Sequence, residues 1–346
     1  MQTRPLGTSG LNVSVICLGT MTWGQQNSET EAHQQMDVAL THGVNFFDTA
    51  EMYPVPPTKE TSGLTEQYIG TWFKARNNRQ KVILATKVVG RSSNFNYLRG
   101  SPTKLDKANI LAALDASLKR LQTDYIDLYQ LHWPDRNTNM FGQLGYTHDD
   151  SEQPTAIAET LGVLDDCVRA GKIRHVGLSN ESAYGVMAYL QTAETKNLPR
   201  MQSVQNPYSL LNRTYEIGLA EVSIRANCGL LAYSPLAMGI LSGKYLGGQK
   251  PAGSRMALFT RFQRYNNAKA EAATARYVKI ANDAGLDPSQ MALAFVNQQR
   301  FVTSNIIGAT TLAQLKTNIE SMNVKLGSDV LNAIDAVHFD ITNPCP

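Results

Sequence analysis

Eight short apolar runs recur along almost the whole chain, separated by stretches of helical character, and this alternation is the strongest constraint on the fold. The runs lack strict apolar–polar alternation, as expected for parallel strands that are covered on both faces. They lie at residues 15–20, 45–50, 82–87, 126–132, 175–180, 202–207, 230–235 and 304–309. Eight strand–helix units in this order predict an α/β fold, a (β/α)8 TIM barrel.

The segments between the runs carry helix signals. Apolar residues recur at helical spacing in the stretch before Leu121. Ser182 is an expected N-cap, and Asp287 followed by Pro288 combines a capping residue with a first-turn proline. We therefore expect helices at 29–42, 107–121 and 182–195, and another after Asp287.

An open, doubly wound sheet is the structural alternative to the barrel. Such sheets often bind a dinucleotide at a GxGxxG loop that follows the first strand. The sequence has no such motif in that context, which weakens the alternative.

The barrel hypothesis also predicts what lies at each end of the strands. The stretch "RPLGTSGLNVS" (residues 4–14) indicates an N-terminal β-hairpin with Gly10 at its turn. Long loops are expected at the C-terminal face, where such barrels keep their sites, at 54–63, 90–106, 133–154 and 247–267. Since no low-complexity linker marks a boundary, we expect a single barrel domain over residues 1–346.

Composition and charge restrict the partners. The 346 residues carry a net charge of only +3, and the scattered basic residues give no sign of a nucleic acid or membrane surface partner. The four cysteines have no metal-ligand spacing, so we expect no metal and free thiols in a reducing compartment. Without a signal-peptide pattern or an apolar segment of about 18 residues, a cytoplasmic protein is expected.

Polar residues fall repeatedly where the predicted strands end. A carboxylate at the end of an apolar strand loses hydration and requires a partner or a function. Closure of a barrel would bring all of these ends to one mouth. The residues concerned are Asp48, Lys87, His132, Ser179, Asn180, Gln205, Tyr233 and Ser234.

These residues carry a resemblance to a known family. The chain resembles the aldo-keto reductase superfamily over nearly its whole length, and within it the bacterial Tas-like branch. The stretches "EMYPVPP", "LKRLQTDYIDLYQLHWP", "QNPYSLLNR" and "IGATTLAQLKTNIES" carry this resemblance. The family's Asp–Tyr–Lys–His tetrad falls on Asp48, Tyr53, Lys87 and His132.

The resemblance implies reduction of a carbonyl by hydride from a nicotinamide. Negative charge then develops on the carbonyl oxygen, and Tyr53 would supply the proton. The Lys87 ammonium is expected to lower the pKa of Tyr53, while Asp48 neutralises and orients Lys87. A neutral His132 would hydrogen-bond and orient the carbonyl. Each residue alone also fits a structural role, and their occurrence together favours the catalytic one.

The resemblance further implies NADP(H) as cofactor. Ser179, Asn180 and Gln205 would hydrogen-bond the nicotinamide carboxamide, and Tyr233 would stack on the ring. Residues expected along the diphosphate and around the adenosine are Ser234, Leu236, Ala237, Lys244, Arg255, Gly308, Thr310, Gln314 and Asn318. Many family members carry Lys and Arg at the positions of Gly308 and Gln314, so recognition of the 2′-phosphate would depend more on Arg255, Lys244 and Thr310.

Substrate and competing functions stay open. The partner is expected to be a small-molecule carbonyl compound, with Trp23, Tyr97, Trp133, Phe141 and Tyr208 as wall residues that suit core packing equally well. One alternative is a Schiff-base aldolase that uses Lys87. Another is a redox-sensing partner subunit that binds NADP(H) and turns over slowly, as the resemblance to potassium-channel β subunits allows.

Overall fold

Eight parallel strands close into a barrel in this computed structural model, which describes residues 1–100 and 102–346. The predicted (β/α)8 fold is confirmed. The strands are β3 (Ile16–Gly19), β4 (Phe46–Asp48), β5 (Ile83–Val88), β6 (Ile126–Leu131), β7 (Ile173–Ser179), β8 (Met201–Pro207), β9 (Gly229–Tyr233) and β10 (Val302–Ile307). Closure is visible at Asn305 of β10, which lies in register with Ile16 on one side and Ala232 on the other. The open-sheet alternative is therefore wrong.

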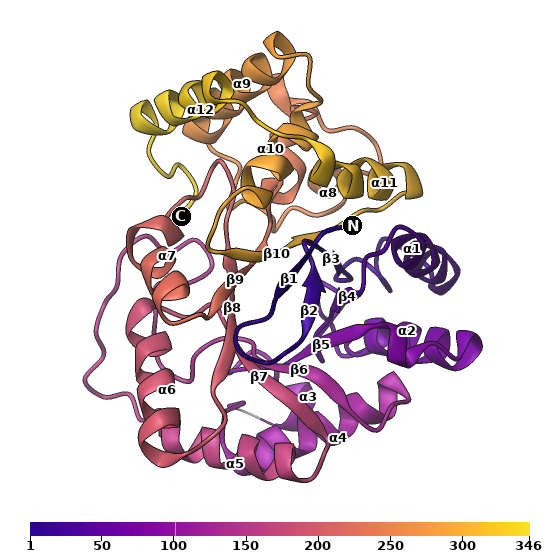
Figure 1. Cartoon of the computed structure of the whole chain (residues 1–346), viewed down its shortest axis with the longest axis vertical. Helices are drawn as coiled ribbons and strands as arrows, with labels where there is room; N and C mark the ends of the chain where they lie inside the picture. The colour runs from indigo at the N-terminus through magenta and orange to yellow at the C-terminus, as the bar shows by residue number, and fades with distance from the viewer. Residues whose placement is uncertain (101) are drawn as a thin grey trace.

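Helices form an outer ring around the strands (Figure 1). The longer ones are α1 (Glu29–Thr41), α2 (Leu64–Arg76), α4 (Lys107–Leu121), α5 (Ile157–Arg169), α6 (Ala183–Lys196), α7 (Tyr215–Arg225), α9 (Ala268–Asp283), α10 (Pro288–Asn297), α11 (Leu312–Glu320) and α12 (Ser328–Asp340). The predicted caps are present: the side chain of Ser182 accepts from the backbone of Gly185, and that of Asp287 accepts from Gln290. None of the helices within the described residues is long and apolar enough to cross a bilayer.

The predicted N-terminal hairpin consists of β1 (Thr3–Pro5) and β2 (Asn12–Ser14), with Gly10 at φ 79° in the connecting turn. Leu6 and Val13 pack with the inward-facing Phe46 and Leu128 of the barrel. The hairpin therefore covers the amino-terminal end of the strands, and only the carboxyl end is left for a site.

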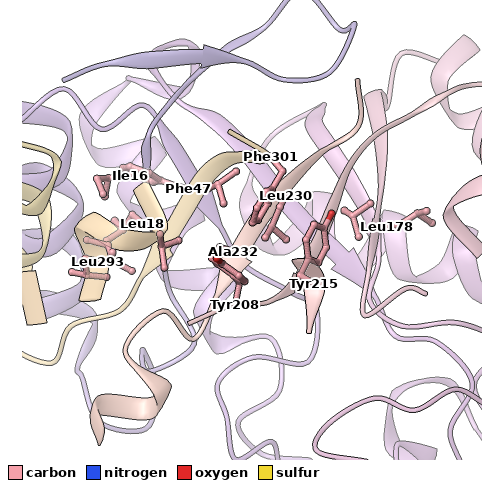
Figure 2. Close-up of a cluster of buried hydrophobic side chains, with 14 of the residues drawn as sticks. Ile16, Leu18, Phe47, Leu178, Tyr208, Tyr215, Leu230, Ala232, Leu293 and Phe301 are labelled. Carbon is pink, nitrogen blue, oxygen red and sulfur yellow. The ribbon is translucent and has the colours of Figure 1, made fainter. Parts of the chain in front are cut away.

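A second core lies between the strands and the helices. Figure 2 shows part of it, with Leu18 and Leu230 from strands and Leu293 from α10 among its members. Two residues of this layer, Trp23 and Tyr208, are fully buried. Trp23 donates to Gln35, and Tyr208 donates to Glu216 and stacks on Phe295.

Long loops crowd the carboxyl end of the barrel, as predicted. They contain the short helices α3 (Asn96–Arg99) and α8 (Arg255–Leu258) and the 3-10 turns η2 (Ala237–Ser242) and η3 (Leu246–Gly248). Residues of these loops line a cavity of about 1210 Å³ together with the strand ends. The remaining 3-10 turns, η1 (Arg79–Lys81) and η4 (Ser321–Asn323), lie elsewhere.

Candidate active site

The predicted tetrad converges at this cavity. Asp48, Tyr53 and His132 line it, whereas Lys87 is fully buried behind them. The side chains come from the end of β4, the loop that follows it, β5 and the residue after β6. Four positions that are remote in sequence are thus brought together because adjacent parallel strands end at one mouth.

A buried ion pair forms the base of the site. Nζ of Lys87 lies 2.6 Å from Oδ2 of Asp48 and donates to the backbone oxygen of Thr49 at 2.7 Å. Burial opposes the ammonium form, but the neighbouring Asp48 and Tyr53 outweigh it, so the pKa of Lys87 is raised. Lys87 is therefore a stable cation at neutral pH.

Tyr53 lies directly above this cation. Nζ of Lys87 is 4.9 Å from the centre of the Tyr53 ring. Burial raises the pKa of Tyr53, and the opposing effect of Lys87 does not cancel it. The expected net lowering is therefore wrong for this form of the protein, because the sequence argument counted the ammonium and omitted desolvation. Tyr53 keeps its proton.

His132 stands on the other side of Tyr53. Its ring meets the Tyr53 ring edge-on, with 5.8 Å between centroids, and packs against Trp133 at 4.9 Å. Burial, and then the charge of Lys87, hold the pKa of His132 well below its usual value, so the imidazole is neutral. The backbone oxygen of His132 accepts from Nδ2 of Asn180 at 2.9 Å, which ties the histidine to β7.

Two glutamines extend the network across the barrel, and sequence reasoning missed one of them. Nε2 of Gln130 and Nε2 of Gln205 both donate to Oδ1 of Asp48, at 3.0 and 2.8 Å. Nε2 of Gln205 also donates to Oε1 of Gln130 at 3.1 Å. Gln130 is fully buried in β6. Its signal in the sequence was a single amide within the apolar run 126–132.

A second missed contact joins two segments of the mouth. Glu51, in the loop that carries Tyr53, is buried and accepts from both terminal nitrogens of Arg99 in α3. It also accepts from the backbone nitrogen of Val89 at 2.7 Å. This ion pair fastens the loop at 90–106 beside the tetrad. No spacing in the sequence indicated that these residues would pair.

Asn180, Ser179 and Tyr233 are linked along the opposite wall. The Tyr233 hydroxyl donates to Oδ1 of Asn180 at 2.6 Å, and Nδ2 of Asn180 donates to the Ser179 hydroxyl at 3.1 Å. Burial raises the pKa of the Tyr233 phenol, and the nearby charge of Arg264, from the loop at 247–267, opposes that shift. All four line the cavity, which fixes the orientation of the Tyr233 ring there.

The segment after β9 supplies cations. Ser234, Leu236, Lys244 and Arg255 line the cavity, as do Met238 and Arg261, which sequence reasoning did not select; Ala237 is buried and is not among the lining residues. Among the described residues, Lys244, Arg255 and Arg261 form no ion pair with a carboxylate. Burial lowers the pKa of Arg255. Lys244 and Arg255 are half-buried and Arg261 is exposed, and cations at a cavity wall without a carboxylate partner suit an anionic ligand.

Gly308 after β10 and the start of α11 complete the cavity. Gly308, Thr310, Gln314 and Asn318 all line it. A Cβ added at Gly308 would meet no atom within 4 Å, so the glycine leaves open space beside the backbone. Oε1 of Gln314 accepts from Thr310, and Nδ2 of Asn318 donates to the Gly308 oxygen at 3.1 Å. Open space at this backbone and unpaired cations opposite fit an elongated, phosphate-bearing ligand.

Aromatic and apolar side chains form the outer wall next to Tyr53. Tyr97, Trp133 and Phe141 line the cavity as expected, and Phe95 joins them. Trp133 contacts Phe95 and Phe141, with ring centroids 5.7 and 5.9 Å apart. For Trp23 and Tyr208 the sequence left wall and core roles open, and both belong to the core beneath the helices.

The described residues contain no group of His, Cys, Asp and Glu side chains that could hold a metal ion. A closed barrel with a buried lysine–aspartate pair, a tyrosine and a neutral histidine at its carboxyl end defines a (β/α)8 protein equipped for proton transfer beside a deep cavity.

Comparison with known proteins identifies the family. The model of the Aldo/keto reductase family matches residues 15–338, and the chain belongs to this family of oxidoreductases. It is 55% identical to Protein tas of Escherichia coli K12 over 346 residues, which is 100% of both chains. It is 33% identical over 338 residues to a Bacillus subtilis protein named uncharacterized oxidoreductase YrpG, covering 97% of this chain and 96% of that one. An aldo-keto reductase of Babesia bovis is 39% identical over 279 residues, covering 76% and 98%.

Proposed function

We propose that the protein reduces an aldehyde or ketone to an alcohol with NADPH. The observation that carries this proposal is the Lys87 ammonium, held between Asp48 and Tyr53 at the base of a cavity. A nearby ammonium stabilises the negative charge that a phenol carries after it has donated its proton. When bound, the dihydronicotinamide supplies the hydride.

Tyr53 acts as the general acid in this proposal. Its raised pKa keeps the phenol protonated before reaction. As negative charge develops on the carbonyl oxygen, the phenol donates its proton, and the nearby Lys87 ammonium stabilises the phenolate that results. Asp48 holds Lys87 in position. Neutral His132 donates a hydrogen bond to the same oxygen and sets the orientation of the carbonyl.

The proposed cofactor-binding residues lie along the cavity wall opposite the tetrad. Ser179, Asn180 and Gln205 would hold the carboxamide, and Tyr233 would support the ring. Lys244, Ser234 and Leu236 would lie along the diphosphate, and Arg255 would lie near the adenosine phosphate. Gly308, Thr310, Gln314 and Asn318 would surround the adenosine. The unpaired cations favour NADP(H) over NAD(H), because the 2′-phosphate adds negative charge.

The substrate is proposed to be a small carbonyl compound with an apolar or aromatic substituent. Phe95, Trp133 and Phe141 form the wall nearest to Tyr53 and His132. Arg91, whose backbone oxygen accepts from Nε1 of Trp133, is already paired with Asp135 at 2.7 Å. A flat apolar group would therefore find a better match here than a carboxylate.

The Schiff-base aldolase is disfavoured by the raised pKa of Lys87, since a nucleophilic amine must be neutral. Borohydride trapping of a covalent adduct at Lys87 would support the aldolase. A redox-sensing subunit that binds NADP(H) would show tight cofactor retention and very slow turnover across all carbonyls.

The test of the reductase is the loss of NADPH absorbance in the presence of aromatic, aliphatic and dicarbonyl aldehydes. We expect turnover with apolar aldehydes and a lower KM for NADPH than for NADH. No turnover with any member of the panel would contradict the proposal. We also propose that residues 1–346 form one barrel domain and that the protein works in the cytoplasm, where its buried free cysteines stay reduced.

A further inference from the structure

Gln130 is a buried amide at the centre of the barrel that the mechanism above does not use. A buried amide without hydrogen bonds would destabilise the fold, but the NH2 of Gln130 donates to Asp48 and its carbonyl oxygen accepts from Gln205. Its position in β6 places it between Asp48 of β4 and Gln205 of β8, which lie on different sides of the mouth. Since Gln205 also donates directly to Asp48, the three side chains form a closed triangle of hydrogen bonds, in which Gln130 gives the Gln205 NH2 its second acceptor.

The Asp48 carboxylate determines which way both amides point. A carboxylate only accepts, so the group of Gln130 that faces Oδ1 of Asp48 must be its NH2. Oε1 of Gln130 then faces Gln205, which must present its own NH2 in return. The orientation of Gln205 is thus fixed by chemistry, independently of how well nitrogen and oxygen can be told apart.

This leaves Gln205 with one free group. Its NH2 donates to Asp48 and to Gln130, and among the described residues nothing donates to its Oε1. Gln205 lines the cavity. The neighbouring Asn180 already binds Tyr233, Ser179 and the backbone of His132. The Gln205 carbonyl is therefore an open acceptor aimed at a ligand donor.

We propose that Gln130 is a positioning residue: it holds the Gln205 carbonyl toward the cavity, where it accepts a hydrogen bond from the NH2 of the nicotinamide carboxamide. This inference rests on the proposed function, because it takes NADP(H) to be the ligand. The inference connects the tetrad with the cofactor. Asp48 neutralises Lys87 and also sets the orientation of the Gln130 and Gln205 amides, and through them the position of the carbonyl that accepts from the carboxamide.

The test compares two oxidised cofactors in binding to the full chain. NADP⁺ carries the carboxamide, and its 3-acetylpyridine analogue has a methyl group in place of the NH2. The wild type should bind NADP⁺ about 3- to 10-fold more tightly than the analogue, as one neutral hydrogen bond predicts. In Gln130→Met this ratio should fall at least twofold, because the Gln205 NH2 keeps only its bond to Asp48 and the carbonyl can swing about that single bond. Titration of tryptophan fluorescence gives both dissociation constants.

Leu128→Met is the matched control, because Leu128 is buried in the same strand but lies in the apolar core. It should keep the wild-type ratio. If Gln130→Met does not fold, Gln130→Asn keeps a buried amide that is too short to span Asp48 and Gln205, and it should lower the ratio at least twofold. A Gln130 variant that folds and discriminates as well as the wild type would overturn the proposal.

The outcomes separate this inference from the proposed function. Discrimination in the wild type that falls at least twofold in the Gln130 variant supports the inference even if no carbonyl is reduced. Equal affinity of the wild type for both cofactors overturns it while leaving the reductase proposal standing. Absence of NADP⁺ binding overturns both.

Discussion

Nζ of Lys87 and Oδ2 of Asp48 lie 2.6 Å apart, with 0% and 3% of the two side chains exposed. Two buried charges at this distance are held by each other and by further hydrogen bonds: Thr49 accepts from the lysine, and the amides of Gln130 and Gln205 donate to the aspartate. The pair therefore stabilises the fold only while both members are present, and this property leads to the first prediction.

Lys87→Met should destabilise the protein by roughly 3–5 kcal/mol, because it leaves the Asp48 carboxylate buried without a counter-ion. The double variant Asp48→Asn/Lys87→Met removes both charges and should recover most of that free energy of unfolding. Urea denaturation of the two variants measures the difference. Equal stability of the single and double variants would show that the pair is not electrostatically coupled.

Tyr53→Phe should lower the rate of NADPH-dependent carbonyl reduction by about 10²–10⁴-fold, the usual contribution of one general acid. Tyr97→Phe is the control, because Tyr97 lines the same cavity and its hydroxyl contacts only Ser62 among the described residues. The control should keep its activity within about twofold of the wild type, since it takes no part in proton transfer. If Tyr53→Phe is equally active, Tyr53 is not the acid.

The neutral His132 should make the native state sensitive to acid. The pKa of His132 in the folded protein lies well below its value of about 6.5 in the unfolded chain. Below about pH 6.5 the unfolded chain therefore binds a proton at this histidine that the native state does not bind. Stability therefore rises with pH in this range and is lost as the pH falls. The free energy of unfolding of the wild type, relative to that of His132→Gln, should drop by about 1 kcal/mol between pH 7 and 5.5.

His175 and His338 also have pKa values lowered first by burial, and both are present in the two proteins. Their contributions cancel in the comparison. A difference between wild type and His132→Gln that does not change with pH would mean that His132 titrates normally in the folded protein.

Arg255→Met should raise the KM for NADPH by roughly 10- to 100-fold, the loss expected for a hydrogen bond to a charged phosphate. The KM for NADH should change far less, because the nucleotide lacks the 2′-phosphate. Lys250→Met removes a cation from an exposed position in the same loop and should leave both constants unchanged. Parallel increases for both cofactors would instead assign Arg255 to the diphosphate.

The barrel was predictable because each strand needs only a local apolar run between helical stretches, and each of the eight runs overlaps a strand of the barrel. The boundaries were less accurate: β4 has only three residues, and β7 begins at Ile173. The convergence of Asp48, Lys87 and His132 followed from topology, since it required only that the strand ends meet.

Features that depend on three-dimensional packing were not accessible from the sequence. The aromatic Tyr208 appeared equivalent to Phe141 in sequence, yet one lies beneath α10 and the other at the mouth. The net direction of the Tyr53 pKa depends on how much burial accompanies the nearby cation. Gln130 became a site residue only when β6 was placed between β5 and β7, opposite Gln205.

The Glu51–Arg99 ion pair has a consequence for altering substrate range. It fastens the middle of the loop at 90–106 to the segment that carries Tyr53, so Phe95 and Tyr97 project from a stretch that is anchored independently of their own identity. Variant libraries that randomise Phe95 and Tyr97 but keep the Glu51–Arg99 ion pair can change the shape of the cavity mouth without moving Tyr53. Exchanging the whole loop, by contrast, would discard the anchor together with the selectivity.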